Sequence, residues 1–500
     1  MTAAIANSTV DTVRLAGDIS ISTSLTVKRT VTLDLNGHVL KYESANKGSV
    51  IVVENGGQLT IEDSNTSNLS HKFNPNGKLW VLDEASGTET VTGGVITGGT
   101  GTDISTFGGT TWYCGGALIK NGGSLTMRGG NIIGCSAECG GGVCIDSEQG
   151  QFSMSDGSIA GCVASDIGGG VCASGTFKMS GKAVIRSCTV ESANNFICGG
   201  GVYVDGSFEM SGEATIKGCQ AISDSANGGG VYVNSSRSFV MSEKAKIENC
   251  QAISNSSGGR GKGGGVHLVN NTQFTLSGNA VIQNCTAANS ANTGEAYGGG
   301  VSAANVREIT LEGSARIADC AAENGSGLYI TGSQTPGYGI LYANGGSVDG
   351  DVVLGGAYEP CTITGSGETV FNGKVTVTPG STIESGTFNG EVINNGTITG
   401  GTFNGTVNNT GTITGGVFNN TVSGSGTIKG GTFNAPMTGS GTESDPYQIG
   451  TAEQLKLFRD IVNGSNGQTP NRGRQSETIP KKIRFTTRAH LTAAATPFPA

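Results

Sequence analysis

The sequence has little charge, few prolines and no long apolar run. Only 14% of its 500 residues are charged, and the formal net charge is -9. The acidic residues are scattered and there is no basic stripe, so binding to nucleic acid or to an anionic membrane surface is not expected. No apolar run approaches the roughly 20 residues of a membrane-spanning helix. Residues 1–18 also lack the basic and apolar regions of a signal peptide.

Hydrophobic residues are scarce as well. They make up 35% of the chain, and aromatic residues 6%, which is too little for the three or four compact cores that the length would suggest. Glycine is abundant, with 86 residues, but 10 prolines and no strict triplet exclude collagen. Val, Ile, Phe and Thr at alternating positions argue against disorder. The composition favours an elongated repeat protein.

Internal repeats are the strongest feature of the sequence. Triple-glycine clusters followed by a Val-x-Val-like pair start at residues 140, 168, 199, 228, 263 and 298. With the weaker copies at 114 and 325, neighbouring starts lie 26 to 35 residues apart. Each unit continues in the same order, as in Phe208 and Met210, then Ile216, then Cys219. Alternation with period two indicates short strands with one buried face, and these strands need neighbouring units to complete a sheet.

Stacking such units about 4.8 Å apart turns each inward position into a ladder of like side chains. The valine ladder contains Val143, Val171, Val202, Val231, Val266 and Val301. The phenylalanine ladder contains Phe152, Phe177, Phe208, Phe239 and Phe274, and the isoleucine ladder contains Ile132, Ile159, Ile185, Ile216, Ile247, Ile282 and Ile317. The glycines mark tight corners between strands. Unit length varies in Ser/Asn/Gly tracts such as residues 254–265, which we predict to be loops at one corner.

The units "LTMRGGNIIGCSAECGGGVCI" and "FKMSGKAVIRSC", with the opening "VTLDLNGHVL", resemble the parallel β-helix repeats of bacterial cell-surface proteins, the pectin-lyase-like superfamily in the broad sense. The resemblance covers roughly residues 10 to 360. It implies an all-β fold, a right-handed parallel β-helix, and an extracellular or cell-wall location of the adhesin type. On this reading the export signal and the anchor lie outside the given sequence.

A stricter repeat of fifteen residues follows the main units. Its positions are Phe388, Phe403, Phe418 and Phe433; Ile383, Ile398, Ile413 and Ile428; and Val392, Val407 and Val422. The shorter period predicts a narrower solenoid. After it, Thr451 as N-cap, Gln454, and the stripe Leu455, Phe458 and Val462 predict one short helix. We divide the chain into a cap with first coils at 1–70, the main β-helix at 71–360, the fifteen-residue section at 361–440, a linker with the helix at 441–465, and an irregular, disordered tail at 466–500.

Seven of the thirteen cysteines occupy one repeat position, three residues after the ladder isoleucine: Cys135, Cys162, Cys188, Cys219, Cys250, Cys285 and Cys320. A small thiol suits a narrow inner corner, so we predict a reduced packing ladder, with bridged pairs and metal binding as alternatives. The other six lie at corners or outward positions, and Cys144 and Cys172 are candidates for a surface bridge. The spacing of Cys135, Cys139 and Cys144 matches no common zinc-ligand pair, so no metal and no cofactor are predicted.

Many parallel β-helices are enzymes that use a carboxylate cluster with an arginine or lysine. The sequence has no Asp-Asp pair and only four histidines, and Asp146, Asp156, Asp166 and Asp205 are expected on different sides of the coil. We therefore expect a non-catalytic surface protein, a stalk or adhesin. The alternative is a polysaccharide lyase or glycoside hydrolase acting on uronic-acid polymers.

The outward residues between the ladder valines are candidates for ligand binding. Tyr203, Tyr232 and His267 follow one another at this position. Stacked aromatic rings on an exposed strip would suit the apolar faces of sugars, so the predicted partner is a glycan or a host surface. The alternative is that tyrosine simply favours a half-exposed strand. The sequence does not indicate an oligomeric state.

Overall fold

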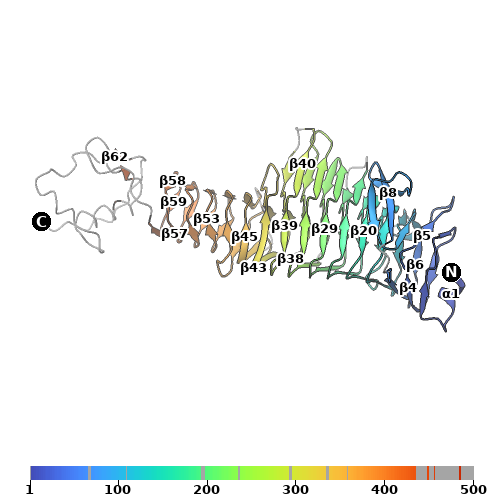
Figure 1. Cartoon of the computed structure of the whole chain (residues 1–500). Coiled ribbons are helices and arrows are strands. Elements are labelled where there is room, and N and C mark those ends of the chain that lie inside the picture. The colour runs from blue at the N-terminus through green and yellow to red at the C-terminus, as the bar shows by residue number, and fades with distance from the viewer. Residues whose placement is uncertain are drawn as a thin grey trace, which may run out of the picture.

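The structure is a computed structural model that describes residues 2–65, 69–107, 110–192, 197–234, 237–291, 295–333, 337–356 and 359–434, with only 448–449, 455 and 484–485 beyond them. The described chain forms an elongated stack of short strands, with the N-terminus at one end and the fifteen-residue coils at the other (Figure 1). The expected all-β fold, a parallel β-helix, is confirmed.

One coil illustrates the plan of the whole stack. It contains β27 (Val202–Val204), β28 (Ser207–Met210) and β29 (Thr215–Lys217), and the next coil begins with β32 (Val231–Val233). Buried and more exposed residues alternate along β27 and β28, as period-two sequences require. Each strand pairs in parallel with its counterpart one coil further along, so equal positions lie directly over one another.

The three predicted ladders are confirmed. A 15-stranded sheet from β3 (Leu25–Val27) to β58 (Val422–Ser423) carries the valine ladder, whose members are register partners. A 30-stranded sheet carries the phenylalanine and isoleucine ladders in two columns. The long strand β43 (Glu308–Ala318) belongs to both columns and joins them. One hydrophobic cluster therefore runs without interruption from Ile5 to Phe418.

The glycine corners have a steric cause. Gly199 has a φ of +73°, a conformation that other residues rarely adopt. A Cβ on Gly201 would lie 2.7 Å from the carbonyl oxygen of Gly230 and 3.2 Å from the sulfur of Cys219. The third glycine of each cluster and the ladder cysteine therefore share one narrow corner of the core.

The structure corrects the prediction that the Ser/Asn/Gly tracts are loops. Parts of these tracts form a 12-stranded sheet, which we call the lateral sheet. It includes β30 (Gln220–Ser223) and β31 (Ser225–Asn227), and β36 (Arg260–Lys262) lies within the supposed loop 254–265. These strands pair in register with the same segments of neighbouring coils and enclose a small core rich in alanine. Figure 1 shows this sheet projecting from the stack near β40 (Thr286–Asn289).

Two further elements lie near the N-terminal end. Helix α1 (Thr2–Ala6), which the sequence analysis did not predict, places Ile5 against the first coils with 1% of its surface exposed. An antiparallel sheet of β8 (Ser70–Asn76), β9 (Leu79–Leu82) and β10 (Glu89–Thr92) packs its Trp80 against Gly161 and Arg186 on the outside of the isoleucine column. These segments cap one end and cover part of one face.

The fifteen-residue coils are confirmed as a narrower continuation. Strands β51 (Thr387–Phe388), β54 (Thr402–Phe403) and β57 (Val417–Phe418) stack in register, with ring centroids 4.9 Å and 4.7 Å apart. Buried asparagines form a second kind of ladder, in which Asn394 Nδ2 donates to Asn409 Oδ1 at 2.7 Å. The Asn394 amide is thereby satisfied, and its Oδ1 also accepts from the backbone N–H of Gly396 at 3.2 Å, whereas the buried Asn409 Nδ2 has no hydrogen-bond partner among the described residues.

The short helix predicted from Thr451 to Val462 lies outside the described residues, apart from Leu455, and so does most of the predicted linker and tail. The proposed domain limits stay predictions. Among the residues that the structure describes, no helix has the length and apolar character needed to cross a membrane.

Candidate functional site

The three aromatic residues selected from the sequence lie in one stack. Tyr203 on β27, Tyr232 on β32 and His267 on β37 (Val266–Val269) are successive register partners. The rings of Tyr203 and Tyr232 are 5.4 Å apart and inclined by only 7°, while the His267 ring lies 5.6 Å from Tyr232 and is tilted by 49°. The repeat therefore brings these side chains together as the sequence indicated.

The expectation that this stack forms an exposed strip is wrong. Tyr232 is 4% exposed and His267 is 2% exposed. The lateral sheet covers them, because Cys198 and Lys262, which interact with Tyr232 and His267, belong to its strands β26 (Ile197–Cys198) and β36. Ligand binding at these three residues stays a prediction. Tyr203 is half-buried, but binding at Tyr232 and His267 would require the lateral sheet to move away.

Burial sets the protonation of these groups. Burial raises the pKa of Tyr203 and of Tyr232 above the usual tyrosine value, so both are neutral hydroxyls near pH 7. Burial, assisted by the charge of Lys262, lowers the pKa of His267 to about 3. The neutral imidazole donates from Nδ1 to the carbonyl oxygen of Ser302 at 3.0 Å. The stack therefore has the character of a buried core.

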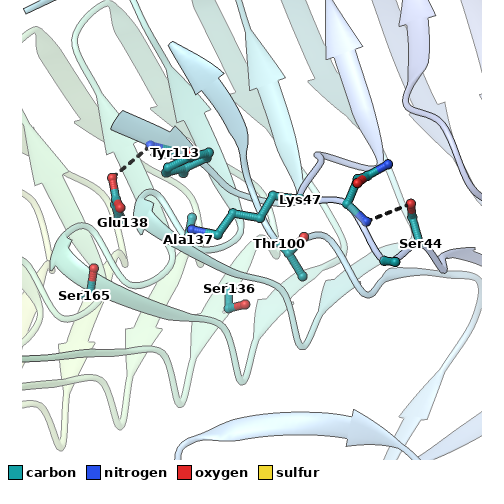
Figure 2. A pocket seen from close by; sticks show the side chains of 10 residues that line it. Ser44, Lys47, Thr100, Tyr113, Ser136, Ala137, Glu138 and Ser165 are labelled. Atoms are coloured by element: carbon teal, nitrogen blue, oxygen red, sulfur yellow. Dashed lines mark hydrogen bonds between the residues drawn. The ribbon is translucent and has the colours of Figure 1, made fainter. Parts of the chain in front are cut away.

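A groove of about 460 Å³ is lined in part by strands of the lateral sheet and is the first of two candidate sites. It lies between the segment after β5 (Val39–Tyr42) and the strands β13 (Thr110–Cys114), β17 (Ser136–Cys139) and β21 (Val163–Ile167). Figure 2 shows Lys47 extending across the groove towards Tyr113, with Glu138 on the far side. Hydroxyl groups complete the lining: Ser44, Thr100, Ser136 and Ser165. We call this the Tyr113 groove.

Specific contacts fix the chemistry of the Tyr113 groove. The ammonium of Lys47 lies 3.8 Å from the centre of the Tyr113 ring, a cation–π contact, and the backbone N–H of Tyr113 donates to Glu138 Oε2 at 3.2 Å (Figure 2). Burial and the neighbouring charge of Glu138 raise the pKa of Asp166. A half-buried ring, an ammonium and a carboxylate surrounded by hydroxyl groups can stack on and hydrogen-bond to a polyhydroxylated ligand.

A second groove of about 420 Å³ follows the corner between the 15-stranded sheet and the phenylalanine column. Serine, threonine and glycine line most of it, and Arg237 crosses it to reach Glu148 at 2.6 Å. Asp205 lies within electrostatic range of both charges, and burial raises its pKa. We call this the Arg237 groove. Its lining holds one arginine and one carboxylate, and Asp205 adds a second carboxylate nearby; these are the residue types that uronate-cleaving enzymes require.

The expectation that Asp146, Asp156, Asp166 and Asp205 lie on different sides is wrong for two of them. Asp146 directly follows Ile145, and Asp205 directly follows Val204. Ile145 and Val204 are both register partners of Ala173, which lies in the strand between them. The two acids therefore share one corner, two coils apart. Burial also raises the pKa of Asp146, which lies close to the Lys120 and Glu54 ion pair.

The cysteines divide as predicted into an inner ladder and a second group. The seven ladder residues are free thiols within the described chain, six of them fully buried and Cys320 partly so. The expected surface bridge between Cys144 and Cys172 is wrong: Cys144 is bonded to Cys114, and all of these cysteines are buried. Cys144 and Cys172 point in parallel from neighbouring strands of one sheet, whereas Cys114 approaches from the facing lateral sheet. In the ranges that the structure describes, no group of His, Cys, Asp and Glu is placed to hold a metal ion.

Sequence reasoning missed both grooves. Lys47 and Tyr113 are far apart in the chain, as are Glu148 and Arg237, and none of them occupies a repeated ladder position. The only signal in the sequence was the aromatic pair in "TWYC" just before a glycine corner. The chain matches no family model, no curated protein and no solved structure.

Proposed function

We propose that this chain is a non-catalytic stalk or adhesin on the surface of a bacterium, and that it contacts glycans through the Tyr113 groove. The resemblance of the repeats to those of surface β-helix proteins supports this role. So does the continuous ladder core, because a rod built this way holds its two ends apart and keeps a lateral site accessible. The main observation behind the glycan assignment is the Tyr113 ring among hydroxyl, ammonium and carboxylate groups.

Sugars fit this combination for a physical reason. A pyranose ring has an apolar face of C–H groups that packs on an aromatic ring, and an edge of hydroxyls that exchange hydrogen bonds with side chains. Glu138 can accept such bonds, Lys47 can donate them, and the serine and threonine hydroxyls can do either. The ammonium also favours sugars that carry a carboxylate.

Glycan contact is tested with an array of plant, host and bacterial glycans. We expect the wild-type chain to bind, and Tyr113→Ala and Glu138→Gln to lose at least tenfold in affinity. Tyr342→Ala is the matched control, because Tyr342 is a half-buried tyrosine on the outer face of β45 (Ile340–Val348), away from the groove. Full binding by Tyr113→Ala, or a wild-type chain that binds no glycan, would contradict the proposal.

Surface display needs a separate test. Intact cells of the source organism are treated briefly with protease, and the released peptides are identified by mass spectrometry. We expect peptides of this chain in the released fraction, with a cytoplasmic marker protein retained in the cells. Peptides found only after lysis would remove the surface assignment.

The Arg237 groove favours a second candidate, a lyase acting on uronic-acid polymers. Arg237 would bind the substrate carboxylate, and Asp205, whose pKa is raised by burial, would exchange a proton with the sugar. Incubation with polygalacturonate and calcium, followed by ultraviolet absorbance of the unsaturated product, tests this candidate. Steady product formation that disappears in Arg237→Gln would replace the non-catalytic proposal, and no product would eliminate the lyase.

A further inference from the structure

A second, smaller core lies between the outer face of the 15-stranded sheet and the lateral sheet. It contains four cysteines together with aliphatic and aromatic neighbours: Cys114, Cys139, Cys144 and Cys172. Cys114 ends β13 and Cys139 ends β17, both in the lateral sheet. Cys144 lies in β18 (Val143–Ile145) and Cys172 in β22 (Val171–Ala173), both in the 15-stranded sheet. Two cysteines therefore face two cysteines across this core.

The register relates the two pairs by one coil. Cys114 and Cys139 are register partners in the lateral sheet, and Cys144 and Cys172 are register partners in the facing sheet. The disulfide joins Cys114 to Cys144, with Cα atoms 5.6 Å apart. A step of one coil along both sheets moves this pair onto Cys139 and Cys172. These two residues thus occupy the repeat positions of an existing disulfide.

The same crossing between the sheets recurs further along the rod. Two further steps of one coil lead from Cys139 to Cys198 in the lateral sheet and from Cys172 to Tyr232 in the 15-stranded sheet. The side chains of Cys198 and Tyr232 interact, as this register requires. Tyr297 of β41 (Ala296–Tyr297) meets Tyr329 of β44 (Leu328–Thr331), and their ring centroids are 4.7 Å apart. Contact between a lateral residue and the strand of the following coil is therefore a property of the repeat, and it applies to Cys139 and Cys172.

We propose that Cys139 and Cys172 form a second disulfide, one coil beyond the bond between Cys114 and Cys144, when the chain folds in an oxidising compartment. The oxidant is a small-molecule or protein disulfide. One thiolate attacks it and forms a mixed disulfide, releasing one thiol. The second cysteine then displaces the other half as a second thiol. The two protein thiols lose their protons and are oxidised, and the external disulfide is reduced to two thiols.

The timing of the reaction follows from the burial of the thiols. The pKa of Cys139 is raised because of its hydrogen bond with Cys172 and because it is buried, so little thiolate forms in the folded protein near pH 7. Exchange is therefore slow once the lateral sheet is in place. The bond forms during folding, and afterwards it fastens the lateral sheet over the aromatic stack.

Peptide mapping of the whole chain tests the proposal. The reduced, unfolded chain is refolded with oxidised and reduced glutathione, remaining thiols are alkylated in denaturant, and the protein is digested after glutamate. Cleavage after Glu138, Glu148 and Glu191 gives peptides 139–148 and 149–191. In the variant Cys114→Ser/Cys144→Ser the first peptide contains Cys139 as its only cysteine, so a link between the two peptides involves Cys139 unambiguously.

We expect the two peptides to be linked in both the wild-type chain and this variant, with fragmentation assigning the link to Cys172. Cys162 and Cys188 lie in the same second peptide but belong to the inner ladder, and they serve as internal controls that carry the alkyl label. Alkylated Cys139 and Cys172 in a wild-type chain whose Cys114 and Cys144 are linked would overturn the proposal. A disulfide between Cys172 and Cys144 would overturn it equally, and so would coordination of the Cys139 and Cys172 thiols to a metal ion.

Discussion

At the scale of single residues, glycine and cysteine share one corner of the core because both are small. The Cβ that a substitution would add to Gly230 lies 2.6 Å from the carbonyl oxygen of Gly265, 2.9 Å from a methyl of Ile247 and 3.3 Å from the sulfur of Cys250. The carbonyl belongs to the backbone of the next coil and cannot turn aside. A larger residue on either side would force successive coils apart.

We therefore predict that Gly230→Ala destabilises the main β-helix by about 1–3 kcal/mol, the usual cost of overpacking a closely packed core. Gly17→Ala is the matched control, because a Cβ there meets nothing within 4 Å. Urea unfolding followed by circular dichroism measures both variants. Equal midpoints for Gly230→Ala and the wild type would show that the coils can separate without cost.

His267 gives a prediction about acid stability. Its pKa is about 3 in the folded chain, because of burial and the charge of Lys262, and near 6.5 when the chain is unfolded. Below pH 6.5 the unfolded state takes up the proton and the folded state does not. The stability contributed by neutral His267 is therefore complete above pH 6.5 and is lost as the pH falls towards 3.

Relative to His267→Gln, the wild-type chain should lose about 1.4 kcal/mol for each pH unit between 6.5 and 3. Urea midpoints measured from pH 7 to pH 4 for both chains give this difference, since all other titrating groups are common to them. Parallel pH profiles for the two chains would mean that His267 takes up its proton without unfolding.

At the scale of elements, the stacked rings set the strength of each coil. Phe403 is fully buried between Phe388 and Phe418, with ring centroids 4.9 Å and 4.7 Å away. Phe433 has a described ring neighbour on one side only, Phe418 at 4.8 Å, and is partly exposed. Each coil is stabilised mainly by its two neighbours, as in other repeat proteins.

Phe403→Ala should therefore cost about 3–5 kcal/mol, the usual range for a buried phenylalanine. The same change at Phe433 should cost clearly less, because that ring buries less surface. Hydrogen exchange of the fifteen-residue coils, read peptide by peptide, detects local opening even where unfolding is not two-state. Equal loss of protection in both variants would argue against coupling between neighbouring coils.

The lateral sheet is the element that the sequence did not reveal. Its inward residues include Ala164, Ala221, Ala226 and Ala252, and the strand β36 begins Arg-Gly-Lys. Alanine, serine and glycine differ little in hydrophobicity, so the sequence of these strands shows no alternation of apolar and polar residues with period two. The strands form because the coils on either side hold these segments in register, where their backbone groups pair.

At the scale of the whole molecule, the stack determines the shape. Fifteen strands of one sheet, spaced about 4.8 Å apart, extend over roughly 70 Å. We predict an asymmetric pair-distance distribution in small-angle X-ray scattering of the monomeric chain, with a tail towards long distances. A symmetric distribution, as for a compact sphere of 50.3 kDa, would contradict the rod.

The sequence by itself determined the core of this protein. Identical side chains at a constant spacing, with period-two alternation, leave one arrangement that hides them all, so the valine, phenylalanine, isoleucine and cysteine ladders could be predicted residue by residue. Only the tertiary structure decided what lies on the outside. The covering of Tyr232 and His267 and the pairing of Cys114 with Cys144 join the 15-stranded sheet to the lateral sheet, whose strands show no sequence pattern, and the meeting of Lys47 with Tyr113 joins residues outside the repeated positions. Their proximity depends on which coil lies above which, and on how far each lateral strand extends.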